Sequence, residues 1–104
     1  MSIIQTGSFT LSGGGASALG DNDTSSFQSV SFSPAFPEDS QVVVIPMVQT
    51  FNGSDSLGTR VADVTTKGFK IRMNELVVSK NGTKSALSDG SHKRETCGWI
   101  AFTV

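Results

Sequence analysis

The stretch FKIRMNELVV, residues 69–78, decides the fold of this chain. Its first half alternates strictly: Phe69, Ile71 and Met73 are apolar, and a polar or charged residue follows each of them. A period of two residues is typical of a β-strand with one buried and one exposed face. We therefore predict a strand over Phe69–Val78 that packs one face against a core.

The other apolar segments are short as well, and turn-forming Gly, Asn, Asp and Ser residues bound them, whereas helical spacing of apolar residues is absent nearly everywhere. A chain of 104 residues suffices for one packed core and is too short for two. We predict one all-β domain over residues 1–104, with two packed sheets of about three strands each. The six predicted strands are Ile3–Leu11, Phe27–Phe32, Gln41–Thr50, Arg60–Thr65, Phe69–Val78 and Glu95–Val104.

The third predicted strand contains the run VVVI at residues 42–45, which is apolar on both faces. Such a run indicates a strand covered on two sides. Burial within the monomer explains it, and so does a neighbouring subunit on one side. Trp99–Val104 leaves the same two explanations open. Pro46 lacks a ladder donor and therefore predicts an edge position or a bulge.

The connections are predicted as turns and loops. We expect a polar loop over residues 16–26, a turn around Asn52 and Gly58, a tight turn at Lys67 and Gly68, and a long polar loop over Ser79–Arg94.

Charge and composition exclude several classes of partner. Eight basic and nine acidic residues are scattered along the chain and give a net charge of −1. Because a nucleic-acid surface needs a basic stripe, we expect no nucleic-acid partner. The segment Met1–Ser12 has no signal-peptide pattern, and no apolar run has the length of a membrane span. We expect a soluble protein without membrane insertion, which stays in the cytoplasm, leaves by a route without a signal, or belongs to a virion.

Few residues of the chain are suited to catalysis or to metal binding. His92 is the single histidine and is better explained as an exposed loop residue than as a catalytic base. Cys97 is the single cysteine and is expected to be a small buried residue of the last strand. Asp21 and Asp23 lack the remaining ligands of a calcium loop and favour Asx turns. We expect a protein that is not an enzyme and that needs no cofactor or metal.

A set of polar groups in or near the predicted loops remains, and it is suited to hydrogen bonding. Planar Asp, Asn and Arg groups of this kind recognise sugar hydroxyls, while an apolar surface packs on the ring. The candidate residues are Asp21, Asn22, Arg60, Asn74 and Glu75.

Taken in order, four segments resemble the H-type lectins, the family of the snail agglutinins and of the carboxy-terminal domain of slime-mould discoidins. The segments are IIQTGSF at residues 3–9, SVSFSPAFPEDSQVVVIPMVQ at 29–49, TRVADVTTKGFKI at 59–71 and WIAF at 99–102. The resemblance implies a six-stranded antiparallel β-sandwich. It also implies a homotrimer that binds galactose or N-acetylgalactosamine in clefts between protomers, and it leaves open whether two trimers pair.

The resemblance also implies roles for individual residues. It places the sugar-binding Asp of the loop before the second strand on Asp21, beside Gly20, and the sugar-binding Arg at the start of the fourth strand on Arg60. Leu76 and Val77 stand where the snail agglutinins have a Trp-His pair that contacts the sugar. The pocket therefore departs from the family pattern at Leu76. Trp99 in the last strand is expected to pack in the core rather than stack on a sugar.

The residues and the resemblance together favour two alternative functions. The first is a carbohydrate-binding lectin for glycans of the galactose or N-acetylgalactosamine type. The alternative is a non-enzymatic structural or receptor-attachment module, such as a trimeric tip domain of a phage tail or a surface fibre.

Overall fold

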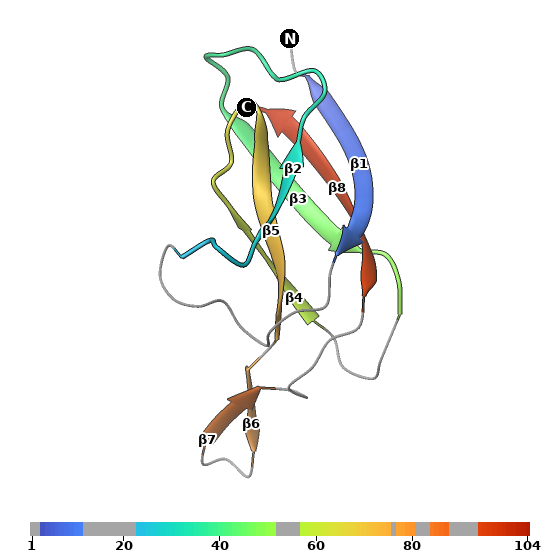
Figure 1. Cartoon of the computed structure of the whole chain (residues 1–104), viewed down its shortest axis with the longest axis vertical. Coiled ribbons are helices and arrows are strands. Elements are labelled where there is room, and N and C mark those ends of the chain that lie inside the picture. Colours follow the sequence, from blue (N-terminus) through green and yellow to red (C-terminus); the bar gives the residue numbers. More distant parts are fainter. Residues whose placement is uncertain (1–2, 12–22, 52–56, 76, 81–83, 88–93) are drawn as a thin grey trace.

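The computed structural model describes residues 3–11, 23–51, 57–75, 77–80, 84–87 and 94–104. Six of its strands form two antiparallel three-stranded sheets, which face each other as two layers (Figure 1). The predicted all-β fold with two three-stranded sheets is confirmed. One sheet has the order β1-β8-β3, with β1 at Ile4–Leu11, β8 at Glu95–Thr103 and β3 at Val42–Val48. The other has the order β2-β5-β4, with β2 at Gln28–Ser31, β5 at Gly68–Glu75 and β4 at Leu57–Ala62.

Two further strands form a hairpin where a long loop was predicted. β6 (Val77–Lys80) pairs antiparallel with β7 (Lys84–Leu87). The predicted fifth strand accordingly ends at Glu75, and its last residues belong to β6. The sequence between β6 and β7 contains Asn-Gly, the strongest short hairpin signal, so the polar composition of this segment was misleading.

The fourth strand lies about three residues earlier than its apolar pattern predicted. β4 includes Gly58, which was expected in a turn, and it ends at Ala62 rather than at Thr65. Asp63 stops the strand because its φ of 50° lies in the left-handed region, which a β-ladder does not use. The turn is then closed by the amide of Thr65, which donates to the carbonyl oxygen of Gly68 at 2.9 Å.

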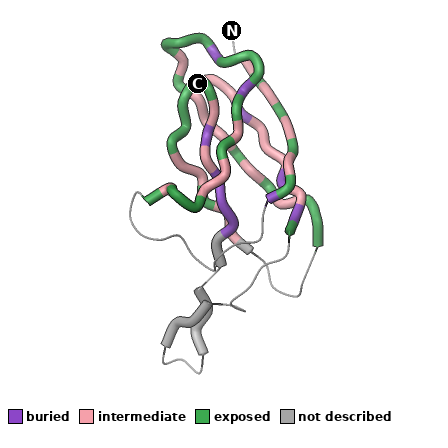
Figure 2. Tube along the Cα trace, viewed as in Figure 1, coloured by how far each residue is buried: buried purple, intermediate pink, exposed green. Residues whose placement is uncertain are grey.

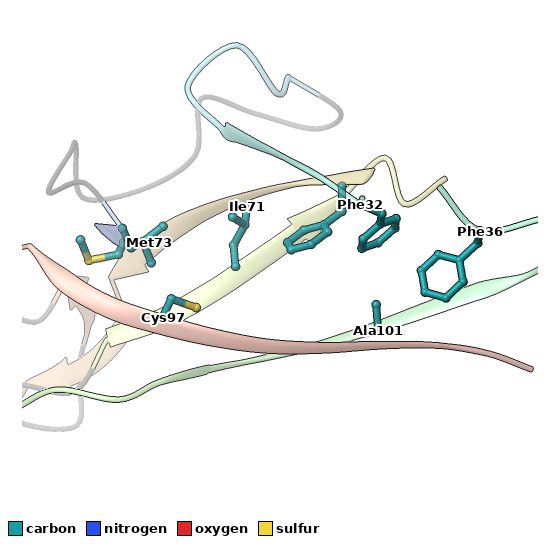
Figure 3. Packing of buried hydrophobic residues seen from close by; sticks show 8 residues of the cluster. Phe32, Phe36, Ile71, Met73, Cys97 and Ala101 are labelled. Atoms are coloured by element: carbon teal, nitrogen blue, oxygen red, sulfur yellow. The ribbon is translucent and has the colours of Figure 1, made fainter. Parts of the chain in front are cut away.

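The core lies between the two sheets and draws on both (Figure 3). Ile71 and Met73 of β5 point toward Cys97 of β8 from the opposite layer. Cys97 is fully buried, as predicted, and burial raises the pKa of its thiol, which favours the neutral form. The buried core residues are Leu11, Phe32, Phe36, Phe69, Ile71, Met73, Cys97 and Ala101.

Trp99 packs against this core, as predicted. Its ring centroid lies 5.5 Å from that of Phe32 and 5.5 Å from that of Phe69. Gly7 lies opposite Trp99 in the β1–β8 register, and a Cβ at Gly7 would be 2.6 Å from the indole ring. The indole therefore occupies the space that a side chain at Gly7 would need.

The outer face of the β1-β8-β3 sheet carries no charged residue. Outward and inward positions alternate along β1, which appears in Figure 2 as exposed and half-buried residues in turn. Ile4, Ile45 and Met47 are 61%, 51% and 64% exposed, although all three are large and apolar. We call this surface the uncharged face. Its residues are Ile4, Thr6, Ser8 and Thr10 of β1, Val43, Ile45 and Met47 of β3, and Thr96, Gly98, Ile100 and Phe102 of β8.

Strand β3 forms one edge of this sheet. It pairs with β8 and with no other strand of the described residues, so the edge position predicted from Pro46 is confirmed. Within the described ranges, the chain has no helix of the length and apolarity needed to cross a membrane.

Candidate functional site

The outer face of the β2-β5-β4 sheet carries three cations. Because Phe69, Ile71 and Met73 point into the core, the alternate residues Lys70 and Arg72 belong to the outer face. Arg60 of β4 lies directly opposite Arg72, and Ala62 lies opposite Lys70. On the other side of β5, Ser29 of β2 lies opposite Lys70. We call Arg60, Lys70 and Arg72 the cationic face.

Arg72 holds its charge in a fixed and buried position. The residue is only 6% exposed although it belongs to the outer face, and its Nη1 donates a hydrogen bond of 2.6 Å to Oγ of Ser26. Its Nε donates to the carbonyl oxygen of Met73, also at 2.6 Å. Removing a charge from water is costly, and hydrogen bonds of this kind offset the cost and fix the orientation of the guanidinium group.

Lys70 links the turn after β4 to the segment before β2. Its Nζ lies 3.4 Å from Oδ2 of Asp63 and donates to Oγ1 of Thr24 at 3.3 Å. The side chains of the ion pair are 39% and 57% exposed, so the pair stabilises the fold by no more than about 1 kcal/mol. The effect of Lys70 is therefore mainly to position the two segments.

The segment 23–27, which precedes β2, is built around Asp23. Oδ1 of Asp23 accepts hydrogen bonds from the backbone amide of Ser25 at 3.1 Å and from its hydroxyl at 2.7 Å. The hydroxyl and the amide of Ser25 hold the pKa of the Asp23 carboxyl below its ordinary value. The Asx turn predicted for Asp23 is confirmed, and the contacts of Thr24 and Ser26 hold this segment against β5.

Of the predicted site residues, Arg60 is the one for which the structure describes both the backbone and the exposure. It is exposed, and it is the fourth residue of β4 rather than at the start of a strand as predicted. Asn74 and Glu75 are the last residues of β5, and their backbone pairs with Gly58 and Leu57 of β4. The remaining predicted residues, Gly20, Asp21, Asn22 and Leu76, lie outside the described residues, as does His92.

The sheet with the cationic face and the sheet with the uncharged face approach each other at their β4 and β3 edges. Arg60 lies on β4, an edge strand of its sheet, and β4 approaches β3, an edge strand of the other sheet. Ile45 and Met47 of the uncharged face lie on β3. A protein seated on the β3 edge is therefore close to the strand that carries Arg60.

Three residues of functional interest were not predicted. The alternation of apolar and polar residues predicted that Arg72 lies on the polar side of its strand. Its position opposite Arg60 depends on the β4–β5 register, which could not be predicted from the sequence. Phe51 is 91% exposed, an unusual state for an aromatic ring. Glu95 is only 6% exposed, and its Oε1 accepts a hydrogen bond of 3.0 Å from the hydroxyl of Thr50.

The described residues contain no cluster of three or more His, Cys, Asp or Glu side chains that could hold a metal ion. The groups that the site does offer are guanidinium, ammonium and hydroxyl groups, which bind by hydrogen bonding and charge.

Neither the known protein-family models nor the curated proteins include a match to this chain. Its function must therefore be inferred from its own residues.

Proposed function

We propose that this protein is a lectin. It binds glycans of the galactose or N-acetylgalactosamine type without a metal ion, it is not an enzyme, and it works as a homotrimer with sugar sites in clefts between protomers. The observation that carries the proposal is the exposed guanidinium of Arg60 opposite the fixed Arg72, on a sheet face against which the segment before β2 is held.

The chemistry of this surface suits sugar hydroxyls. A guanidinium group presents several donors in one plane, and two of them can reach neighbouring hydroxyl oxygens together. The segment before β2 adds the hydroxyl groups of Thr24 and Ser26 beside Lys70 and Arg72. The resemblance to the H-type lectins uses the same two parts of the chain, the loop before the second strand and the arginine of the fourth.

The uncharged face supports association with further copies of the chain. A sheet face that exposes Ile4, Ile45 and Met47 and carries no charged residue is suited to contact with another protein surface. Because β3 adjoins β4, a second copy on the β3 edge approaches the strand that carries Arg60. This arrangement fits a sugar cleft shared by two protomers, and three weak sites in one trimer gain affinity for clustered glycans.

The same face also fits the alternative, a structural or receptor-attachment module of a phage tail or fibre. Such a module needs a stable trimer but no sugar site. Both functions therefore use the uncharged face for association, whereas only the lectin needs Arg60 for binding.

A glycan array combined with light scattering tests the proposal. The wild-type protein is expected to have the mass of a trimer and to bind glycans with terminal galactose or N-acetylgalactosamine. Arg60→Ala should keep that mass and lose the binding, because the side chain is exposed and outside the core. Phe51→Ala serves as a second variant, which lowers affinity if the exposed ring packs on a sugar.

A trimer that binds no glycan at high protein concentration would contradict the lectin and favour the attachment module. A monomer would contradict both.

A further inference from the structure

We propose that the edge of β1 is a strand-pairing site for a second copy of this chain, whose own β1 adds to it antiparallel across a twofold axis. This contact joins two sheets edge to edge and does not depend on sugar binding. It is also separate from the trimer contact proposed above, which uses the outer face of the same sheet.

The main-chain groups of β1 point alternately toward β8 and toward the open edge. The amide of Thr103 donates to the carbonyl oxygen of Ile3 at 3.1 Å, so this pair is hydrogen-bonded, and so is every second pair along the antiparallel register. The amide and carbonyl groups of Ile4, Thr6 and Ser8 therefore point away from β8. Among the described residues these groups have no hydrogen-bond partner.

The free part of this edge is centred on Thr6. Toward the end of β1, the carbonyl oxygen of Thr10 already accepts a hydrogen bond of 3.2 Å from Nε2 of Gln28 in β2. The free groups are thus those of Ile4, Thr6 and Ser8, which are evenly spaced about the middle residue. A twofold axis at Thr6 places Ile4 opposite Ser8 of the second copy, so that free amides meet free carbonyl groups.

The other three edges of the sandwich each have a feature that hinders strand pairing. β2 has only four residues. β3 has Pro46 at a position that points away from β8, and proline supplies no donor there. β4 carries the exposed side chain of Arg60. Short length, proline and charge are the means by which natural proteins protect edge strands.

The β1 edge has none of these protections. The strand is eight residues long, contains no proline and no charged residue, and runs along the margin of the sandwich (Figure 1). Within the described part of the chain, it is therefore the one sandwich edge that is open to a further strand.

The composition of β1 favours a second copy as the added strand. Two identical β1 strands oppose no like charges, because the strand has no charge. The twofold axis sets Thr6 beside its counterpart in the second copy, and cross-strand threonine pairs are favourable. A foreign segment is selected by pockets for its alternate side chains. Thr6 and Ser8 have small, exposed side chains, which do not enclose such pockets.

Two measurements on the wild-type protein test the inference. The pairing uses the main-chain groups of few residues, so sedimentation equilibrium from micromolar to millimolar chain concentration should show the mass rising above its value at dilution. Over the same range, the amides of Thr6 and Ser8 should exchange fast at dilution and slow by about tenfold when about nine in ten copies are paired. The amide of Phe9 points toward β8 and should be protected throughout, as an internal control.

Variants of β1 locate the contact. Thr6→Pro gives the β1 edge the feature that β3 has at Pro46: it removes an outward donor and leaves the hydrogen bonds to β8 in place. It should weaken the pairing by at least about tenfold, because both copies lose a central hydrogen bond. Thr6→Val is the matched control, which keeps the amide and the shape of the side chain and should pair nearly as the wild type does.

Ser8→Lys is a second test that leaves the backbone of β1 unchanged, and it decides the question if Thr6→Pro does not fold. A lysine on the edge should prevent the pairing, since two copies would bring two added charges together.

Three outcomes would overturn the inference. Slow exchange of the Thr6 and Ser8 amides at every concentration would mean that they are covered within the single chain. A mass that does not rise would mean that no pairing occurs. A mass that rises in Ser8→Lys as it does in the wild type would place the contact elsewhere. None of these results bears on glycan binding, so the lectin function stands or falls separately.

Discussion

The two outer faces of the sandwich differ in charge. The uncharged face of the β1-β8-β3 sheet has no ionisable side chain and exposes Ile45 and Met47. The cationic face of the β2-β5-β4 sheet places Arg60, Lys70 and Arg72 together. Both sheets have three strands and share one core, so the architecture does not explain the difference.

This difference teaches that the inward residues specify the sandwich while the outward residues specify its partners. An uncharged, apolar sheet face is suited to another protein surface, and a charged face is suited to a polar ligand in water. We infer a division of roles, with association on one face and recognition on the other, joined along the β3 and β4 edges.

The largest effect is expected from Ile45→Asp, which places a carboxylate on the edge strand β3 of the uncharged face. Burying an unpaired charge in an interface costs several kcal/mol, so the proposed trimer should dissociate to monomers. Light scattering at several protein concentrations measures this directly.

The matched control is Ser29→Asp, which adds the same charge on the other outer face, where Ser29 lies opposite Lys70. It should leave the mass unchanged. Trimers of Ile45→Asp as stable as those of the wild type would mean that the uncharged face is not the contact.

A smaller effect, on the free energy of unfolding, is expected from a substitution on the inner side of the β1-β8-β3 sheet. Gly7→Ala forces a Cβ to within 2.6 Å of the Trp99 ring and should lower the free energy of unfolding by about 1–3 kcal/mol. Trp99 is the single tryptophan, so its fluorescence should also shift.

Gly98→Ala, on the outer side, is the control. Its Cβ would lie 3.4 Å from the side chain of Gln49, which can move, and stability should change by less than about 0.5 kcal/mol. Equal effects of the two variants would contradict the packing of Trp99 over Gly7.

Arg60→Gln should have a still smaller effect on stability. Because the side chain of Arg60 is exposed and outside the core, the free energy of urea unfolding should change by less than about 0.5 kcal/mol. Arg60→Lys should change it equally little. A clear loss of stability in Arg60→Gln would show that Arg60 has a structural role, which would weaken its assignment to binding.

The smallest effect concerns pH. Since the folded state holds the pKa of Asp23 below its ordinary value, the carboxylate stabilises the fold fully above that ordinary value. This contribution is lost as the pH falls toward the lowered pKa. Asp23→Asn should therefore make unfolding slightly less dependent on acid, as urea titrations at a series of pH values can measure. An unchanged acid profile would contradict the role of the Asp23–Ser25 hydrogen bonds.

Much of the fold could be predicted from alternation, because Phe69, Ile71 and Met73 repeat with the period of a strand and all three are buried. The end of β4 could not, because it depends on the left-handed conformation of Asp63, which apolar spacing does not reveal. The β6–β7 hairpin was missed for a different reason: its polar composition outweighed its Asn-Gly signal.

The candidate site was less accessible to sequence reasoning. Arg60 could be named from the resemblance. That Arg72 lies opposite it could not be predicted, because the pairing depends on the β4–β5 register, which is set in part by the geometry of the turn between the strands. Similarly, the apolar run at residues 42–45 allowed burial within the monomer or by a neighbour. The exposure of Ile45 removes the first explanation for one side of β3.

Side-chain footprinting of the wild-type protein, with and without N-acetylgalactosamine, tests the division of roles most directly. Peroxide reports on Met47, which is 64% exposed in the single chain, with the buried Met73 as an internal control, and a dicarbonyl reagent reports on Arg60. We expect Met47 to be protected with or without sugar, and Arg60 to be protected only when sugar is bound. If sugar protected Met47 and left Arg60 reactive, or if Met47 reacted as fast as in monomeric Ile45→Asp, the assignment of the two faces would be wrong.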